Sequence, residues 1–304
     1  MLGITSGPAR RVLTLVWVVV LSALFTRSFS AAQTSPPHLK LVGVIRTTPF
    51  VHTQISMRDG EGSAYVPRDH SLWLADDGTD AIFEVAPTTG RFKRVLEEEA
   101  FRSAHRFGGG PRAGPSRTDD FESMAYDEAD DALYVFSGKC CTGTIRPTVF
   151  RLTRRHGVLQ VDSWQPLGPT SDFTAAGWNS ADHSLYVAAE SDLRTYDYAS
   201  NALGQPFQIA DLSGIFGLSF SRDGSEMHAV THHEMLHTVD WQSQTINPEW
   251  SFDLTPFGVR DSRAVERIGG RFFVLDGATR NGNDRLEYAV FKLDVEDEPT
   301  APPS

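Results

Sequence analysis

The chain has 304 residues, of which 28 are Lys or Arg and 39 are Asp or Glu, so its net charge at pH 7 is −11. Nucleic acid and anionic membranes are bound through clustered Lys and Arg, and an acidic chain makes both poor partners. A cationic ligand fits the overall electrostatic field better.

The first 32 residues have the pattern of an export signal. Arg10-Arg11 precede an uncharged apolar run, Leu13–Phe25, and small residues follow up to Ala32. This run is shorter than the roughly 20 residues that span a bilayer, and no second apolar segment follows. We therefore predict cleavage after Ala32 and an exported protein, periplasmic or extracellular, with no membrane span. Both the general secretory route and the twin-arginine route fit this leader.

Five segments of the remaining chain repeat one pattern, in which a polar entry precedes a short strand of small residues, a turn and a second apolar strand. They are 59–78, 119–138, 172–191, 214–233 and 261–277, and the last one aligns after the loss of two residues in its turn. In the clearest pair Asp59 aligns with Asp120 and Glu61 with Glu122. Internal repeats of this kind indicate a repeat architecture.

The third repeat shows the predicted unit most clearly. It contains four candidate strands, at Phe173–Trp178, Leu185–Ala189, Leu193–Tyr198 and Phe207–Ile209. Four antiparallel strands in about 50 residues are typical of a β-propeller blade. The small residues of each first strand belong beside the crowded central axis. Beyond one turn near 96–101, no helical periodicity is present.

The first strands of the blades can be counted directly. They start near five positions: Glu61, Glu122, Thr174, Phe216 and Arg263. The fifth blade has only three strands of its own, and the N-terminal strand 38–47 would supply the fourth and cover an exposed edge. We therefore predict an all-β, five-bladed β-propeller over 38–294, with a disordered acidic and Pro-rich tail at 295–304. Six blades are the alternative, but the only spare stretch, 97–118, has no strand pattern.

In a four-stranded meander, the link into strand one and the link between strands two and three lie on the same rim. This rim would collect Asp59, Glu61, Asp120 and Glu122, and converging carboxylates raise one another's pKa unless a cation joins them. Oxygen ligands of this kind suit Ca²⁺. We predict Glu61 and Glu122 as ligands, with Asp59 and Asp120 either ligating or supporting them. The alternative is that the acids cap turns, which we expect of Asp172 and Asp261.

The position of Glu61 and Glu122 is occupied by other residue types in the remaining three blades. This asymmetry favours a ligand-binding pocket over side chains that only fill the channel in each blade. Thr174, Phe216 and Arg263 are the predicted ligand-binding residues. Arg263 would either hold a substrate carboxylate or phosphate, or pair with Glu61 or Glu122 across the channel. His232 and His233 are weaker catalytic candidates, as is Arg263. At most one of the two histidines would face the channel if they lie in a strand, where neighbours alternate.

Cys140 and Cys141 are the only two cysteines. In an exported chain thiols usually become oxidised, so we predict a vicinal disulfide. A free pair and bridges to another molecule are the alternatives.

The segment Asp120–Asp127, with the sequence DFESMAYD, resembles the D-x-E-G-[IL]-[AT] entry strand of secreted bacterial propellers. These include the esterase-like-phytase and SdiA-regulated groups. The segment 71–90 is similar to a blade of the lactonase and quinoprotein-like propellers. The resemblance is to single blades, and it implies a central divalent cation held by Glu61 and Glu122.

Three functional classes remain open. The first is a monomeric propeller that binds a small molecule or a cell-envelope partner at a Ca²⁺-containing channel mouth. The second is a cation-dependent hydrolase of phosphate or carboxylic esters. The third, a quinone-dependent redox enzyme, is less favoured because an acidic mouth repels an anionic quinone.

Overall fold

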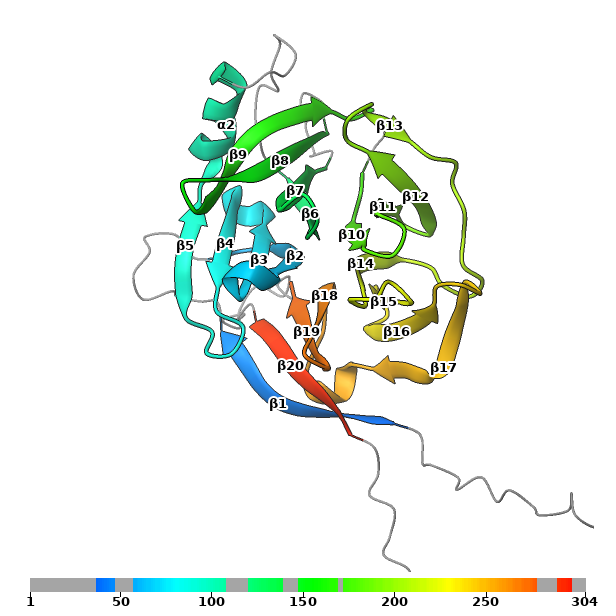
Figure 1. Cartoon of the computed structure of the whole chain (residues 1–304). Coiled ribbons are helices and arrows are strands. Elements are labelled where there is room, and N and C mark those ends of the chain that lie inside the picture. The colour runs from blue at the N-terminus through cyan, green and yellow to red at the C-terminus, as the bar shows by residue number, and fades with distance from the viewer. Residues whose placement is uncertain are drawn as a thin grey trace, which may run out of the picture. The chain divides into compact units, whose positions relative to one another are not determined.

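The computed structural model describes residues 37–46, 57–107, 120–138, 147–168, 172–277 and 289–296, with the side chains of 104–107 excepted. Within these ranges the strands form five four-stranded antiparallel sheets. The sheets are arranged as blades around a common axis (Figure 1). The predicted all-β, five-bladed propeller is therefore confirmed.

The blades follow one another along the chain. Blade one contains β2 (Gly60–Val66), β3 (Ser71–Asp76), β4 (Ala81–Val85) and β5 (Phe92–Leu96). Blade two contains β6 (Phe121–Asp127), β7 (Ala132–Ser137), β8 (Thr148–Arg155) and β9 (Val158–Pro166). Blade three contains β10 (Ala175–Asn179), β11 (Ser184–Ala189), β12 (Asp192–Asp197) and β13 (Ala202–Leu203). Blade four contains β14 (Ile215–Phe220), β15 (Glu226–Thr231), β16 (Met235–Asp240) and β17 (Thr245–Asp253).

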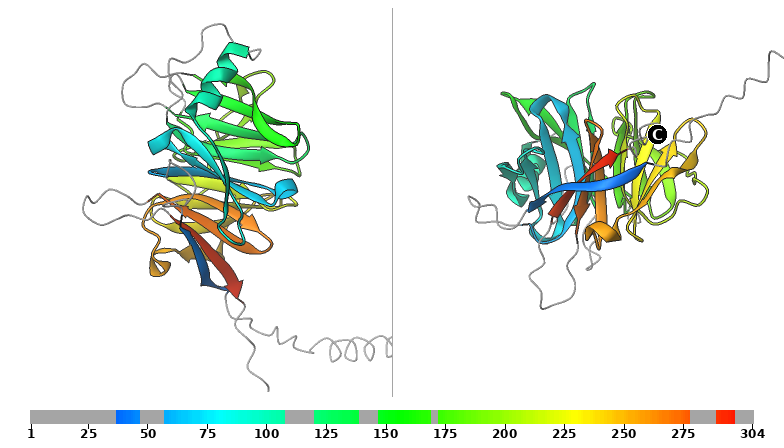
Figure 2. Two further views of the ribbon diagram at one scale, coloured as in Figure 1. Left: turned by 90° about the vertical axis from the view of Figure 1, so that its left-hand side faces the viewer. Right: turned by 90° about the horizontal axis from the view of Figure 1, so that it is seen from below.

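Blade five closes the ring with strands from both ends of the propeller. Its order is β1-β20-β19-β18, from β1 (His38–Arg46), β20 (Ala289–Glu296), β19 (Arg271–Asp276) and β18 (Ser262–Ile268). The strands β1 and β20 run side by side and antiparallel (Figures 1 and 2). The innermost strand β18 also packs against β2 of blade one. The predicted N-terminal closing strand is confirmed, and β20 extends to Glu296, two residues past the expected end of the domain at 294.

Small residues allow the innermost strands to approach one another closely. A Cβ atom on Gly62 would lie 2.7 Å from Cα of Ser123 in the next blade, and one on Gly217 would collide with Cα of Ala264. These positions therefore exclude side chains. Away from the axis, large side chains such as Trp73, Phe83 and Phe136 are fully buried between the sheets.

One helix was not expected. The sequence predicts a single turn near 96–101, whereas α2 (Glu98–Phe107) has 10 residues. Its Phe101 ring packs 4.7 Å from Phe121 and 5.1 Å from Phe150, so burial of this aromatic side chain on blade two stabilises the helix. Three short turns of 3-10 helix complete the described structure: η1 (Pro67–Asp69), η2 (Asp77–Thr79) and η3 (Thr255–Phe257).

The fourth strand of blade three lies earlier than predicted. Residues 202–203 pair with β12, whereas Phe207 makes only an isolated bridge with Leu193. The apolar segment 207–209 is therefore held by side-chain packing more than by a strand ladder.

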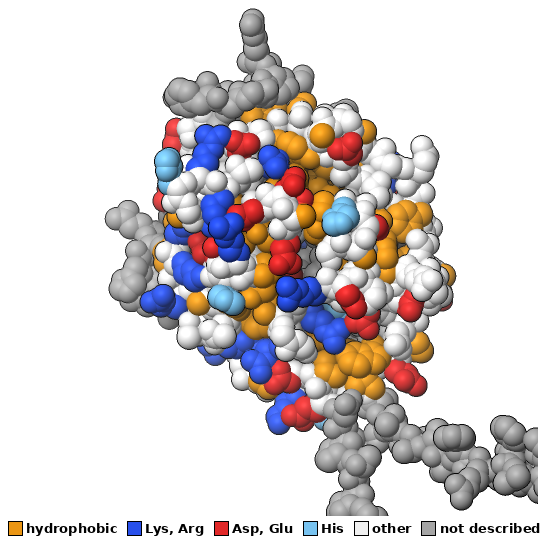
Figure 3. Space-filling view, in the orientation of Figure 1, with side chains coloured by type: hydrophobic (Ala, Val, Ile, Leu, Met, Phe, Trp, Pro, Cys, Tyr) orange, Lys and Arg blue, Asp and Glu red, His pale blue; other side chains and the backbone are white. Residues whose placement is uncertain are grey.

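No helix in the described ranges is both long and apolar enough to cross a membrane. Seen along the ring axis, Lys and Arg side chains lie beside Asp and Glu side chains near the centre of the exposed face (Figure 3).

Candidate metal centre at the channel mouth

The equivalent positions at the start of the innermost strands are shaped by β-bulges. Glu61, Glu122, Phe216 and Arg263 are each the extra residue at a register shift between the first and second strands of their blades. A bulge turns its extra side chain out of the normal strand alternation. In blade three, Thr174 directly precedes β10. The fold therefore brings one residue from each blade to the same end of the channel.

Backbone hydrogen bonds join the loop that enters the first strand of a blade to the loop that follows its second strand. In three blades the residue just after the second strand donates its backbone N–H to the carbonyl of the residue that enters the first strand. The pairs are Asp77 to Asp59 at 2.8 Å, Gly138 to Asp120 at 2.6 Å and Gly277 to Asp261 at 2.9 Å. The entry of strand one and the link after strand two thus share one rim, as the meander predicts.

Buried carboxylates at the ends of two second strands hold the entry loops. Oδ1 of Asp76 accepts from the backbone N–H groups of Arg58 and Asp59 at 2.8 and 2.6 Å. Oδ1 of Asp276 accepts from the N–H of Asp261 at 2.9 Å. Burial raises the pKa of Asp76 to about 6, while these donors oppose the rise.

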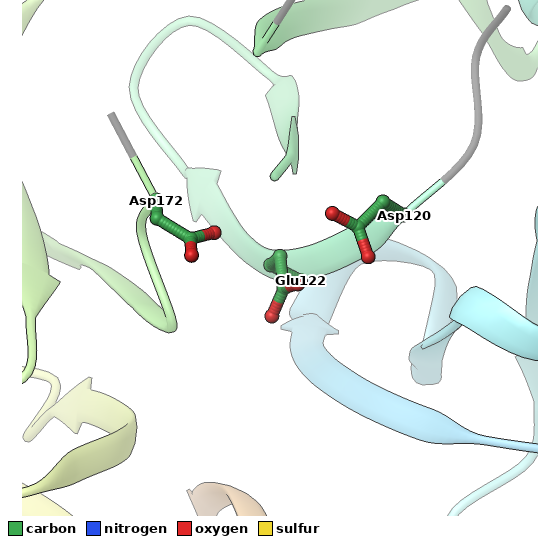
Figure 4. A group of neighbouring side chains, drawn as sticks. All are labelled: Asp120, Glu122 and Asp172. Carbon is green, nitrogen blue, oxygen red and sulfur yellow. The ribbon is translucent and has the colours of Figure 1, made fainter. Parts of the chain in front are cut away.

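Three carboxylates from two blades converge at the mouth. Asp120 and Glu122 of blade two and Asp172 of blade three each offer an oxygen within 4.8 Å of the others. Asp120 and Asp172 face each other across Glu122 (Figure 4). Asp120 is 9% exposed, Glu122 is half-buried and Asp172 is exposed.

Asp172 is the member of this group that the sequence reasoning missed, because it was expected only to cap a turn. The signal was present: Asp172 aligns without gaps with Asp120. What the alignment does not show is that its side chain reaches back to the preceding blade.

The carboxylates are placed where ionisation is costly. Burial raises the pKa of Glu122 well above its usual range, and the nearby charges of Glu61, Asp120 and Asp172 raise it further. Burial also raises the pKa of Glu61 to about 8, and the Arg263 guanidinium opposes that rise. A bound divalent cation would remove the reason for these acids to retain protons.

A glycine makes room for the group. A Cβ atom on Gly138 would lie 2.6 Å from Cγ of Glu122 and 2.7 Å from Oδ1 of Asp172. Any larger residue there would displace the carboxylates, so the local chain geometry accommodates three converging acids.

Glu61 is paired differently from Glu122. Its Oε2 lies 3.0 Å from Nη1 of Arg263, whose Nη2 also donates to Oδ2 of Asp261 at 3.0 Å. The guanidinium lies 4.8 Å above the Phe216 ring. Of the two predicted roles for Arg263, the structure therefore contains the salt bridge to Glu61, formed between the adjacent blades five and one. Glu61 is the neighbour of the group formed by Asp120, Glu122 and Asp172, not a member of it.

The remaining predicted residues have distinct environments. The Thr174 hydroxyl donates to the carbonyl of Ile215 at 2.6 Å and so ties blade three to blade four. His232 and His233 are exposed, with ring centroids 3.7 Å apart. They lie in the turn after β15 and not in a strand, so strand alternation does not apply to them and their rings lie beside each other. The His232 ring is 6.2 Å from that of Phe216.

Several predictions fall outside the described residues. Cys140 and Cys141 lie in the segment 139–146, and the leader and most of the predicted tail are also excluded. Export, tail disorder and the vicinal disulfide stay predictions.

The fold and the mouth define a class: a five-bladed propeller with an acidic channel entrance. No family model and no curated protein sequence matches the chain. In structure it is similar to glutaminyl cyclase from Myxococcus xanthus, with a TM-score of 0.57 and 12% identity over 86% of this chain and 97% of that one.

Two further solved structures have the same likeness. A gluconolactonase from Xanthomonas campestris aligns with a TM-score of 0.51 and 12% identity over 87% of this chain and 96% of that one. A luciferin-regenerating enzyme aligns with a TM-score of 0.51 and 8% identity over 86% and 97%. At these identities the likeness shows the propeller fold alone.

Proposed function

We propose that this protein binds a divalent cation, Ca²⁺, at the channel mouth through Asp120, Glu122 and Asp172. The observation that supports this is the convergence of three carboxylate oxygens within 4.8 Å of one another beside a glycine that leaves room for them. Like charges at this spacing repel unless protons or a cation neutralise them.

The chemistry of the ligands favours Ca²⁺ over other common ions. The group offers only oxygens, whereas Zn²⁺ sites in proteins are usually built with His or Cys. Ca²⁺ takes 6–8 oxygen ligands in flexible geometry, and Mg²⁺ demands a near-ideal octahedron. Extracellular Ca²⁺ modules bind with a Kd of roughly 10⁻⁴–10⁻³ M. Export, predicted from the leader, would place the site where that affinity is sufficient.

The proposed ligand of the site is a small anionic molecule that completes the coordination, because a bound Ca²⁺ and Arg263 would supply positive charge at a mouth that repels anions when it holds no cation. Three carboxylates leave several positions on a Ca²⁺ ion for ligand or water oxygens. Arg263, Phe216 and His232 lie on the same rim and would contact a ligand carboxylate or phosphate and its apolar part. Arg263 would exchange one of its two acidic partners for that group.

A cation-dependent hydrolase is the second candidate. The gluconolactonase among the structural neighbours, which shares the fold, is compatible with it. Here Ca²⁺ would supply Lewis-acid polarisation of an ester carbonyl or phosphoryl oxygen. His232 is the side chain on this rim that could accept a proton from water.

Calorimetric titration of the EDTA-treated, dialysed protein with CaCl₂ tests the metal site. We expect one Ca²⁺ per chain, with Mg²⁺ binding more weakly. Glu122→Gln and Asp172→Asn should each weaken Ca²⁺ binding by at least about tenfold, since each removes a charged ligand. Glu249→Gln, at an exposed position on β17, is the matched control. Absence of binding, or equal affinity in all four proteins, would reject the site.

A second assay separates the two candidates. Lactones, carboxylic esters and phosphate esters would be incubated with the protein in Ca²⁺ and in EDTA. Turnover that requires Ca²⁺ and is lost in Glu122→Gln supports the hydrolase. Tight Ca²⁺ binding without turnover supports the binding protein.

A further inference from the structure

The end of the channel opposite the carboxylates contains a cavity of about 430 Å³. Four aromatic side chains line it, one from each of blades one to four: Tyr65, Tyr126, Trp178 and Phe220. They occupy one repeat position, four residues after the bulge position on each innermost strand. At about 3.3 Å per residue, the cavity lies roughly 13 Å along the channel from the carboxylates.

Blade five breaks this aromatic series and adds a carboxyl group. One position earlier on the strand, blades one to three have Ala64, Ala125 and Gly177, whereas blade five has Glu266. Glu266 lines the cavity and accepts a hydrogen bond from the backbone N–H of Tyr65. Burial raises its pKa well above the usual range, and that backbone donor is the influence that opposes the rise.

Blade four adds a hydroxyl at the same level. Ser219 lines the cavity and is 6% exposed. Among the described residues, its Oγ has no hydrogen-bond partner. Buried polar atoms are nearly always paired, so an unpaired hydroxyl on a residue that lines a cavity indicates a site where a ligand supplies the partner.

The basic groups at the cavity already face acids of their own. Nη1 of Arg267 lies 2.6 Å from Oε2 of Glu226, and the same guanidinium stacks near Trp250 and Phe272. Arg222 lies 3.8 Å from Glu128 at the rim. Among the described residues Glu266 is therefore the acidic group inside the cavity that no basic side chain pairs with, and a cationic ligand would favour its ionised form.

We propose that this cavity binds a small organic ammonium ion, with its nitrogen at Glu266 and Ser219 and its apolar body among the four aromatic side chains. Aromatic rings and a carboxylate together are the usual surroundings of a bound ammonium group. A half-buried carboxylate with a backbone donor but no cationic partner is costly to ionise, and a cationic ligand removes that cost. The volume falls within the roughly 300–1,000 Å³ of small-molecule sites, and the net charge of −11 attracts cations.

This site is separate from the metal centre. Between the two ends, the space among the innermost strands is about 10 Å³, room for no more than roughly one water molecule. A ligand in the cavity therefore does not pass through the channel to the carboxylates, and the two proposals can fail independently.

Three probes with one shared ring system test the proposal: 2-naphthylmethylamine, 2-naphthylmethanol and 2-naphthoate, titrated calorimetrically in EDTA so that the other mouth holds no metal. We expect the amine to bind at least about tenfold more tightly than the alcohol, and the carboxylate to bind most weakly. Glu266→Gln should bring the amine to the affinity of the alcohol. Trp178→Ala should weaken both probes, and Glu249→Gln should change neither.

Equal binding of amine and alcohol to the wild-type protein would overturn the proposal. So would preferential binding of naphthoate, or no binding of any probe at millimolar concentration. These outcomes need only the wild-type chain, so they remain decisive if Glu266→Gln fails to fold. Circular dichroism and melting curves establish whether that variant is folded.

Discussion

Replacing Glu122 with glutamine should stabilise the cation-free protein at pH 7 and abolish most of its response to Ca²⁺. In the folded protein Glu122 holds its proton to high pH because it is buried and close to Glu61, Asp120 and Asp172. In the unfolded chain it ionises near its ordinary value of 4.5. Folding at pH 7 therefore requires this side chain to take up a proton, which costs free energy. Glutamine has the same shape and is already neutral, so the variant avoids that cost.

The size of the effect follows from linkage. For an acid whose folded pKa is raised, stability is highest below the unfolded pKa and falls as pH rises toward the folded pKa. The full slope is about 1.4 kcal/mol per pH unit, but at pH 4.5 only half of the unfolded side chains are ionised, so between pH 4.5 and pH 7 the wild-type protein loses about 3 kcal/mol that the variant keeps. In a domain of this size, about 3 kcal/mol corresponds to a rise in Tm of roughly 6–12 °C. The difference should vanish near pH 4.5.

Thermal melts of the wild type, Glu122→Gln and the Glu249→Gln control, in EDTA and in Ca²⁺, measure this directly. At a Ca²⁺ concentration of 100 times Kd, the wild type should gain about 2.7 kcal/mol, and the variant much less. The reasoning is refuted if Glu122→Gln melts below the wild type in EDTA at pH 7. A difference that is the same at pH 4.5 and pH 7 would also refute it, because the proton would then play no part.

Three further outcomes are expected. Arg263→Gln should destabilise the protein by about 3 kcal/mol in urea unfolding, since it breaks a buried ion pair. The loss is at the low end of the range for such pairs because Glu61 can take up a proton. A change in the free energy of unfolding within experimental error would contradict the salt bridge. Burial lowers the pKa of His228 to about 3. Between pH 6.5 and pH 5 the imidazole therefore gains a proton in the unfolded chain but not in the folded one, and the free energy of unfolding of the wild type should fall by about 2 kcal/mol. His228→Asn should remove this loss, and an unchanged pH profile would show that His228 is not the cause. Gly138→Ala should weaken Ca²⁺ binding in titration by displacing the carboxylates. Gly157→Ala, where a Cβ meets nothing within 4 Å but the positive φ of 84° strains the backbone, should lower stability without changing Ca²⁺ binding.

The repeats in the sequence were sufficient to predict the blades. Each first strand is marked by a polar entry and small residues, and these residues are small because neighbouring strands touch, as Gly62 does with Ser123. The closing strand 38–46 could be predicted because the fifth repeat lacks a partner for its edge. Helix α2 was missed although the sequence carries a helical signal, an acidic first turn and a Glu98–Arg102 pair four residues apart. Packing of Phe101 on blade two then stabilises the helix.

The amino-acid sequence by itself determined which residue types reach the two ends of the channel. Alignment placed Glu61 and Glu122 at one position, because gap-free repeats put equivalent residues at equivalent heights on the axis. The same repeats contain the aromatic series, which was recognised only once the cavity was described. Only the tertiary structure decided which of them meet. In the structure Glu61 pairs with Arg263, and Asp172 joins Asp120 and Glu122. Both contacts lie between neighbouring blades. They depend on closure of the ring, on bulges that redirect side chains and on distances of a few ångströms, and a sequence alignment contains none of these.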